Sequence, residues 1–206
     1  MTKLVLASSS PYRRALLCRL GLPFTTQASM IDETRLPQES AEAMVRRLAS
    51  AKARAVAEPD SLVIGSDQCA VQDGHIVGKP QHHEQAVAQL KRWSGRAVTF
   101  LTSLCLLDCE RDFEQVDVVA YSVYFRELTV AEIERYLRTE QPYDCAGSFK
   151  SEGLGVALFT RMEGSDPNAL VGLPLIRLCE MLAAAGHPVL TLADPAQRPG
   201  TVDQIC

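Results

Sequence analysis

Three serines, a proline and two arginines stand together near the start of the chain, in the segment SSSPYRR at residues 8–14. A short apolar run precedes the segment and a helical pattern follows it. Ser10 is a favourable N-cap and Pro11 suits the first helical position, so a strand, a turn and a helix N-terminus are predicted in succession. That arrangement binds anions, and Arg13 and Arg14 would add charge that suits phosphate oxygens. A capped helix with two solvated arginines is an alternative of equal weight.

An aspartate, Asp67, interrupts the apolar run at residues 62–71 (LVIGSDQCAV). A carboxylate inside such a strand is costly unless it is paired or bound to a metal. Gly65 would permit a bulge or the close approach of a ligand. One alternative is a carboxylate that accepts backbone N–H bonds at a strand end. We favour a functional role, since carboxylates at strand ends serve as metal ligands and general bases.

A lysine falls on the apolar stripe of a predicted helix at about residues 40–58. Lys52 lies between Leu48 and Val56 on the stripe that also holds Met44. Either its ammonium snorkels to water or it meets a buried anion. Snorkelling is the commoner explanation for a single lysine.

Three weaker signals complete the set of candidate residues. Lys79 lies in the turn sequence GKP, where a solvated turn lysine is the ordinary interpretation. The loop SFKSEG at residues 148–153 has the composition of many pocket loops, without being specific. Glu33, which follows Asp32, is either a second acidic partner or ordinary loop charge.

Strands and helices interleave along the chain, which predicts an α/β fold with a mixed sheet. Helices are expected after Ser10, Ser40 and Thr129, each a favourable N-cap, and at residues 81–93 and 173–185. Residues 143–159 are expected to mix loop and strand. Strands are expected at residues 4–7, 62–71, 75–77, 98–108, 116–125 and 189–192.

Composition and charge narrow the class of protein. The 206 residues carry a net charge of −4, with 47% hydrophobic and 22% charged residues, which is typical of a globular protein and argues against a general nucleic-acid binder. The seven cysteines lack zinc spacing and predict free thiols in a reducing cytoplasm. Neither a signal-peptide pattern nor a run long enough to span a membrane is present.

Taken together, these residues resemble the Maf family of nucleotide pyrophosphatases over residues 4 to about 182. The resemblance implies a Maf/Ham1-like (anvil-like) fold, in which a mixed twisted sheet is flanked by helices and two lobes surround a central cleft. It implies one domain over residues 1–193, followed by a polar tail at 194–206. The motifs that carry it are ASSSPYRR (7–14), DET (32–34), Lys52, GSD (65–67) and GKP (78–80).

Three residues indicate a branch within that family. Tyr12 stands where most Maf proteins lack an aromatic residue, Gln68 follows the aspartate, and Glu152 lies in the loop CAGSFKSEG. These features resemble the YceF branch, whose activity is hydrolysis of 7-methyl-GTP to the monophosphate and pyrophosphate. An aromatic face attracts the cationic 7-methylguanine ring, and Glu152 would accept its N–H groups and balance its charge. The rival branch acts on dTTP and UTP.

The resemblance also implies a role for each site residue. Asp67 would be the general base, a metal ligand or both, with Glu33 as the second acidic group for a divalent cation, Mg²⁺ or Mn²⁺. Tyr12, Gln68 and Glu152 would select the base. The substrate would be a small nucleoside triphosphate, and a homodimer follows only from family habit. A nucleotide-binding protein without turnover, or one linked to cell division, is the alternative outside the enzymes. The phosphate ligands would be Ser8, Ser10, Arg13, Arg14, Lys52 and Lys79.

Overall fold

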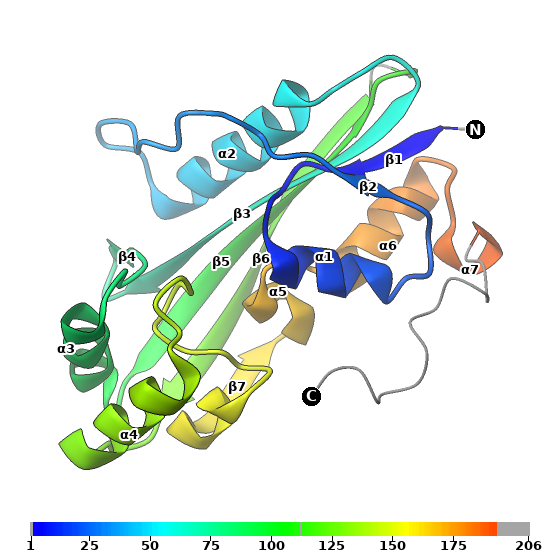
Figure 1. Ribbon diagram of the computed structural model, residues 1–206. Helices are drawn as coiled ribbons and strands as arrows, with labels where there is room; N and C mark the ends of the chain where they lie inside the picture. Colours follow the sequence, from blue (N-terminus) through cyan, green and yellow to red (C-terminus); the bar gives the residue numbers. More distant parts are fainter. Residues whose placement is uncertain (1, 112, 193–206) are drawn as a thin grey trace.

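A seven-stranded mixed sheet forms the centre of the computed structural model, which describes residues 2–111 and 113–192 (Figure 1). The strand order is β2-β1-β3-β5-β6-β7, with β4 beside β3. β1 runs parallel to β2 and β3, and the other pairs are antiparallel. The predicted α/β fold with a mixed sheet is thus confirmed. The strands are β1 (Lys3–Leu6), β2 (Thr25–Thr26), β3 (Ser61–Gln72), β4 (His75–Val77), β5 (Ala97–Asp108), β6 (Phe113–Phe125) and β7 (Phe159–Gly164).

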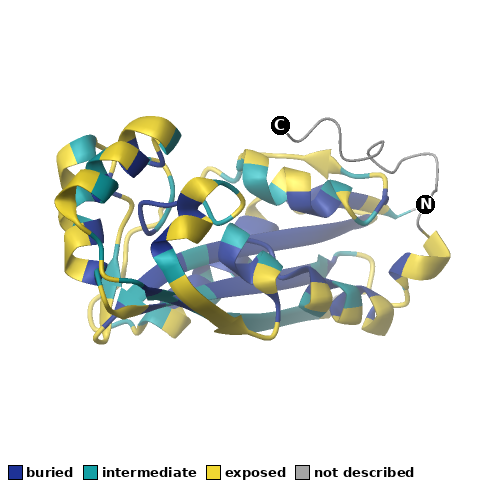
Figure 2. Cartoon of the chain, turned by 90° about the horizontal axis from the view of Figure 1, so that it is seen from below, coloured by how far each residue is buried: buried dark blue, intermediate teal, exposed yellow. Residues whose placement is uncertain are grey.

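Helices cover both faces of the sheet. In Figure 1, α2 lies along one face of the long strands, whereas α1 and α6 lie on the other face near one end, and α3 and α4 gather at the far end. The long strand β3 and most of β5 are therefore buried on both sides, which Figure 2 shows as dark blue along the middle of the sheet, whereas β7 at one edge is mostly exposed. The helices are α1 (Pro11–Cys18), α2 (Ala41–Ala55), α3 (His83–Trp93), α4 (Val130–Glu140), α5 (Pro167–Val171), α6 (Leu175–Ala184) and α7 (Val189–Leu192), with a 3₁₀ helix, η1, at Leu154–Leu158.

The predicted helix caps are present. Ser10 Oγ accepts a hydrogen bond from the backbone N–H of Arg13 at 3.4 Å, and Ser40 Oγ accepts one from Ala43 at 3.1 Å. Thr129 and Glu132 form the reciprocal capping box at the start of α4. These bonds satisfy donors that a helix start would otherwise leave unpaired. They fix where α1 and α2 begin, and with them the residues that face the centre of the molecule.

Two clusters of buried apolar side chains lie at the two ends of the long strands. One cluster joins β1, α1 and α6 to the first half of β3. The other joins α3, α4 and η1 to β5 and β6. Because β3 and β5 run through both clusters, the molecule has two lobes on one continuous sheet, as the predicted fold class requires. Smaller clusters lie between the sheet and α2.

Several local predictions are wrong. Residues 189–192 form the short helix α7 and not a strand, because a mostly apolar segment of four residues suits either state and Pro188 provides a helix start. β7 begins only at Phe159, and α5 was not foreseen. Gly65 forms no bulge, since it pairs in regular register with Cys105. The glycine instead allows α2 to approach, because a Cβ at that position would lie 2.1 Å from the carbonyl oxygen of Ala49.

The structure also bears on membrane-spanning segments and on the state of the cysteines. No helix within residues 2–111 and 113–192 is long and apolar enough to cross a membrane. The six cysteines of those residues are all free thiols. The expected polar tail at residues 194–206 lies outside the described residues.

Candidate active site

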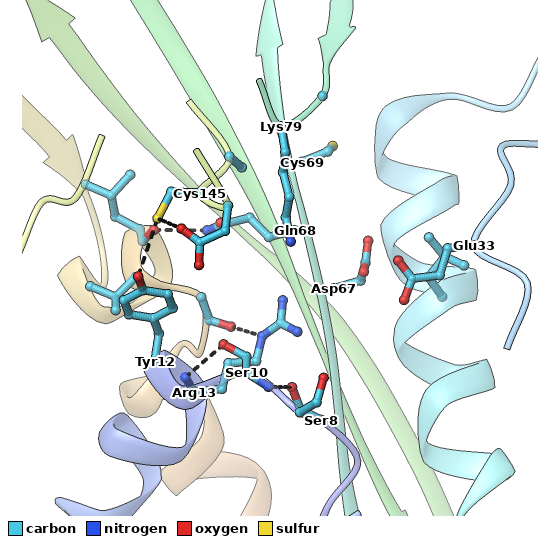
Figure 3. A pocket seen from close by; sticks show the side chains of 18 of the residues that line it. Ser8, Ser10, Tyr12, Arg13, Glu33, Asp67, Gln68, Cys69, Lys79 and Cys145 are labelled. Atoms are coloured by element: carbon cyan, nitrogen blue, oxygen red, sulfur yellow. Dashed lines mark hydrogen bonds between the residues drawn. The ribbon is translucent and has the colours of Figure 1, made fainter. Parts of the chain in front are cut away.

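A cavity of about 570 Å³ opens between the two lobes. Its walls come from the turn after β1, from α2, β3 and the turn after β4, and from the loop before η1 and the end of α5 (Figure 3). Segments from almost the whole length of the sequence therefore meet there. Ten of the predicted site residues line this cavity: Ser8, Ser10, Tyr12, Arg13, Glu33, Lys52, Asp67, Gln68, Lys79 and Glu152.

A buried ion pair lies at the centre of the cavity wall. The Nζ atom of Lys52 lies 2.6 Å from Oδ1 of Asp67 and 2.8 Å from Oε1 of Glu33. Lys52 is 6% exposed and Asp67 is 7% exposed. The lysine on the apolar stripe thus meets a buried anion, and the snorkelling interpretation was wrong. Strand alternation explains the meeting, since the odd-numbered side chains of β3 face α2.

The carboxyl group of Asp67 has a perturbed pKa. Burial raises the pKa above that of an ordinary aspartate, because the charged form loses its hydration. The charges of Lys52 and Arg13 act in the opposite direction and offset part of that effect. An aspartate with a raised pKa, held next to cations in a cavity, has the properties of a general base.

The acidic loop before α2 contributes one carboxylate to the cavity and uses the other for its own shape. Asp32 Oδ1 accepts a hydrogen bond from the backbone N–H of Thr34 at 2.9 Å, and hydrogen bonding by Thr34 lowers the pKa of Asp32. Glu33 lines the cavity, and more than half of its side chain is exposed. The Asp32 turn therefore presents Glu33 toward Lys52.

Arg13 reaches from α1 toward the middle of the cavity (Figure 3). Its Nε donates a 2.8 Å hydrogen bond to the carbonyl of Gly172, just after α5, which leaves the rest of the guanidinium free to face Asp67. Burial lowers the pKa of Arg13, whereas the charges of Asp67 and Glu33 raise it. Its pKa starts so high that the side chain remains a cation.

Arg14 is the predicted phosphate ligand that does not line this cavity. It is exposed and lines a second hollow, of about 320 Å³, together with Ser8, Ser9 and Ser10. Consecutive helical residues point about 100° apart, so Arg13 and Arg14 face different sides of the serine turn. The structure therefore brings only one of the two arginines to Asp67.

Lys79 and the serine turn complete the polar wall. Figure 3 shows the Lys79 side chain extending from the turn after β4 into the cavity. The backbone N–H of Ser10 donates to Ser8 Oγ at 3.1 Å, while Ser10 Oγ caps α1. Three cations, Arg13, Lys52 and Lys79, thus lie around the serine turn and Asp67, in a form suited to a polyphosphate.

Tyr12 marks a different region of the cavity. Its hydroxyl lies 3.7 Å from the Sγ atom of Cys145, and burial is the main reason that its pKa is raised. Asp144 and Glu152 line the cavity in the same region, and their charges also raise the pKa of Tyr12. The aromatic face and two carboxylates form what we call the acidic end of the cavity: Tyr12, Asp144 and Glu152. Cys145 begins the loop motif CAGSFKSEG, whereas Asp144, one residue earlier, was not predicted as a site residue.

Gln68 lines the cavity and also connects three elements by hydrogen bonds. Its Nε2 donates to Thr102 Oγ1 at 2.9 Å and to the backbone carbonyl of Ala169 at 2.8 Å. These bonds fix the side chain between β3, β5 and α5. The sequence signal for α5 was present but unused, since Asp166 is its N-cap and Pro167 follows at the first helical position.

Comparisons with known proteins identify the family of this chain. Residues 3–185 match the family model described as Maf-like protein. A 7-methyl-GTP pyrophosphatase of Nitrosococcus oceani is 58% identical over 189 residues, which cover 91% of this chain and 95% of the relative. Proteins of the same name from Pseudomonas savastanoi pv. phaseolicola and Pseudomonas aeruginosa are 57% and 55% identical; the matches cover 92% and 90% of this chain, and 100% and 98% of the relatives. This chain belongs to the Maf family.

Proposed function

We propose that this protein is a nucleoside triphosphate pyrophosphatase that hydrolyses 7-methyl-GTP to 7-methyl-GMP and pyrophosphate. The relatives that carry this name match nearly the full length of both chains. The observation that carries the proposal is the polarity of the cavity, which has cations around Asp67 and an aromatic face with carboxylates at the acidic end. A ligand that fits both regions has an anionic tail and a cationic aromatic ring, as 7-methyl-GTP does.

The cations and the serine turn would hold the triphosphate. The guanidinium of Arg13 is anchored at Nε, so its remaining N–H donors are directed before the substrate arrives. Lys79 enters from the opposite lobe, so the triphosphate would be held between cations from both lobes. The N-terminus of α1 adds backbone dipoles directed at the same anion.

Asp67 would act as the general base in this proposal. It accepts a proton from a water molecule that attacks one of the two phosphorus atoms joined by the α–β bridging oxygen. The bond between that phosphorus and the bridging oxygen breaks, and the nucleoside monophosphate and pyrophosphate separate. In the structure without substrate, Lys52 pairs with Asp67 and Glu33. A bound triphosphate would compete for the Lys52 ammonium and release the Asp67 carboxylate for the water. Arg13 and Lys79 would stabilise the negative charge that develops on the phosphate oxygens.

The residues present fit a divalent cation held together with the substrate. The described residues contain no group of three or more histidine, cysteine or acidic side chains that would hold a metal by themselves. Asp67 and Glu33 nevertheless share Lys52, and Mg²⁺ is commonly bound by one or two carboxylates plus phosphate oxygens. Mg²⁺ or Mn²⁺ at these two carboxylates would supply charge neutralisation to the phosphates.

The cellular role that we propose is removal of modified nucleotides before their incorporation into nucleic acid. The partner is a small nucleotide, rather than nucleic acid or a membrane, since the net charge of −4 gives no general polyanion-binding surface. We further propose a cytoplasmic location, which suits the free thiols, and a homodimer.

Pyrophosphate release from a substrate panel tests the proposal. The panel is 7-methyl-GTP, GTP, dTTP, UTP and CTP, each with Mg²⁺ or Mn²⁺ and with a chelator. Preference for 7-methyl-GTP is expected, with turnover lost in the chelator. Preference for dTTP and UTP would leave the phosphate chemistry standing and overturn the specificity. Absence of turnover from folded protein would favour a nucleotide-binding protein without catalysis.

A further inference from the structure

The acidic end of the cavity contains one more carboxylate than recognition of guanine requires. Glu152 alone can accept the N1–H and the exocyclic amine of guanine, which are two parallel donors. Asp144 comes from a different part of the same loop and lines the same cavity. Its charge reaches the Tyr12 hydroxyl, as does that of Glu152. The second carboxylate therefore has no evident task with neutral guanine.

The described residues leave the charge of both carboxylates without an ion-pair partner. Within residues 2–111 and 113–192, no lysine, arginine or histidine forms an ion pair with Asp144 or Glu152. Asp144 Oδ1 accepts from the Cys145 thiol at 3.5 Å, and Glu152 Oε2 accepts from Ser151 Oγ at 3.3 Å. Two negative charges close to the hydroxyl of one aromatic side chain, neither of them in an ion pair, favour a cationic ligand at that ring.

The backbone that carries Asp144 is held from several sides. The carbonyl of Tyr143 accepts from the backbone N–H of Gln81 at 3.0 Å. The Tyr143 hydroxyl contacts His83 Nδ1 at 2.9 Å and donates to the carbonyl of Leu137 at 3.2 Å. Asp144 thus follows a residue fixed to both α3 and α4, which holds the backbone of Asp144 at the cavity wall.

We propose that Asp144 is a specificity residue, which selects the cationic 7-methylguanine ring over neutral guanine by charge. The proposal rests on the proposed function and deepens it. Glu152 accepts hydrogen bonds from the donors that both bases share and also adds negative charge, whereas Asp144 acts through its charge alone, on the positive charge that only the methylated base carries. Its contribution passes through partly solvated space, because Asp144 is exposed. Such an interaction weakens at high salt, which a hydrogen bond or a packing contact does not.

The test compares Asp144→Asn with Asp144→Glu and with Asp60→Asn as the matched control. Asp60 is exposed and lies in the turn before β3, and asparagine tolerates its positive φ of 60°. For each protein, kcat/KM is measured for 7-methyl-GTP and for GTP at low and high salt. In Asp144→Asn we expect the ratio of the two to fall by about tenfold at low salt, mostly through KM, and by less at high salt. Asp144→Glu and Asp60→Asn should keep the ratio of the original chain.

A binding arm separates failure of this inference from failure of the proposed function. Calorimetry measures the Kd of 7-methyl-GMP and of GMP for the same four proteins. The original chain could hydrolyse no 7-methyl-GTP and still bind 7-methyl-GMP more tightly than GMP. If Asp144→Asn abolishes that difference in Kd, the inference holds and the catalytic proposal falls. If Asp144→Asn leaves both the kinetic ratio and the binding ratio unchanged, the inference is overturned whatever the enzyme hydrolyses.

Discussion

Lys52 Nζ and Asp67 Oδ1 lie 2.6 Å apart, and both side chains are nearly inaccessible to water. A buried charge that loses all its partners is strongly destabilising; Asp67 depends on Lys52, while Lys52 has Glu33 as a second partner. Burial nevertheless raises the pKa of Asp67 above the ordinary value of 3.8, despite the ammonium beside it. The pair therefore holds a carboxylate with a raised pKa inside the cavity. Because Lys52 influences that pKa, it should also influence the pH dependence of catalysis.

Replacing Lys52 with methionine should move the acid limb of the kcat/KM profile to higher pH. The ammonium lowers the pKa of Asp67, so its removal lets burial raise that pKa further. Because the base must be ionised, activity is then lost at a higher pH as the solution is acidified. Lys52→Arg keeps the charge and should keep the limb nearer its original position. If the acid limbs of the methionine variant and the original chain coincide, the group whose ionisation sets that limb is not Asp67.

Asp67→Asn should remove most turnover, by a factor of about 10² to 10⁴ if Asp67 is the general base. The phosphate ligands are untouched, so a nucleotide should still bind with measurable Kd. Pyrophosphate release and calorimetry together give the two quantities. Near-normal turnover in the folded variant would refute the assignment.

The same variant should be no less stable than the original chain at neutral pH. A raised pKa means that the folded state favours the protonated carboxyl, so the stability due to this group is fully present below the unfolded pKa and lost as the pH rises through the folded pKa. Asparagine resembles the neutral form and leaves Glu33 to pair with Lys52. Thermal unfolding at several pH values measures this, and a sharply lowered Tm would contradict it.

The ring of Tyr12, rather than its hydroxyl, should determine the preference for 7-methyl-GTP. Tyr12→Phe removes the contact with Cys145 and keeps the aromatic face, so the ratio of kcat/KM for 7-methyl-GTP to that for GTP should be retained. Tyr12→Ala removes a cation–π interaction of about 0.5–2 kcal/mol and should lower that ratio. Equal ratios in the alanine and phenylalanine variants would exclude ring recognition of the charge.

Glu152→Gln should erode the preference for 7-methyl-GTP, since the carboxylate supplies both acceptors for guanine and negative charge. A glutamine keeps one acceptor and presents a donor to the base. We expect KM for 7-methyl-GTP and for GTP to rise while turnover of pyrimidine triphosphates rises or stays constant. Unchanged selectivity across the substrate panel would remove Glu152 from the recognition site.

The sequence predicted the residues of the cavity better than their contacts. Ser10, Pro11 and the run around Asp67 each carry a local signal that survives in the structure, because caps and strand burial depend on neighbouring residues. The pairing of Lys52 with Asp67 has no local signal. It depends on where α2 crosses β3, and that crossing is set by tertiary packing.

Asp144 and Arg14 also show that the sequence does not predict which side chains reach the cavity. The family resemblance placed Glu152 of the following loop with Tyr12, but no local signal indicates that Asp144 also lies near Tyr12, more than a hundred residues earlier in the chain. Arg14 belongs to the motif that predicted the anion site, yet the helical rotation turns it away from the cavity of Arg13. A motif indicates which residues share a turn, while the direction of each side chain follows from the helix geometry.

Gly65→Ala should destabilise the fold, because β3 and α2 touch at this glycine. An added Cβ would lie 2.1 Å from the carbonyl oxygen of Ala49 and 3.0 Å from the Cβ of Ala53. Neither atom belongs to a flexible side chain, so α2 itself must move away from the sheet. Overpacking of this kind costs about 1–3 kcal/mol, occasionally more, and outweighs the smaller gain from replacing glycine within a strand.

Because α2 carries Lys52, displacement of that helix should also disturb the ion pair with Asp67 and lower turnover. Gly78→Ala is the matched control, since a Cβ there meets nothing within 4 Å. Thermal unfolding and kcat of the two variants make the comparison. A lowered Tm is expected for Gly65→Ala and not for Gly78→Ala, and a lowered kcat is expected for Gly65→Ala. Equal Tm values would show that the close approach of α2 to β3 tolerates a side chain at residue 65.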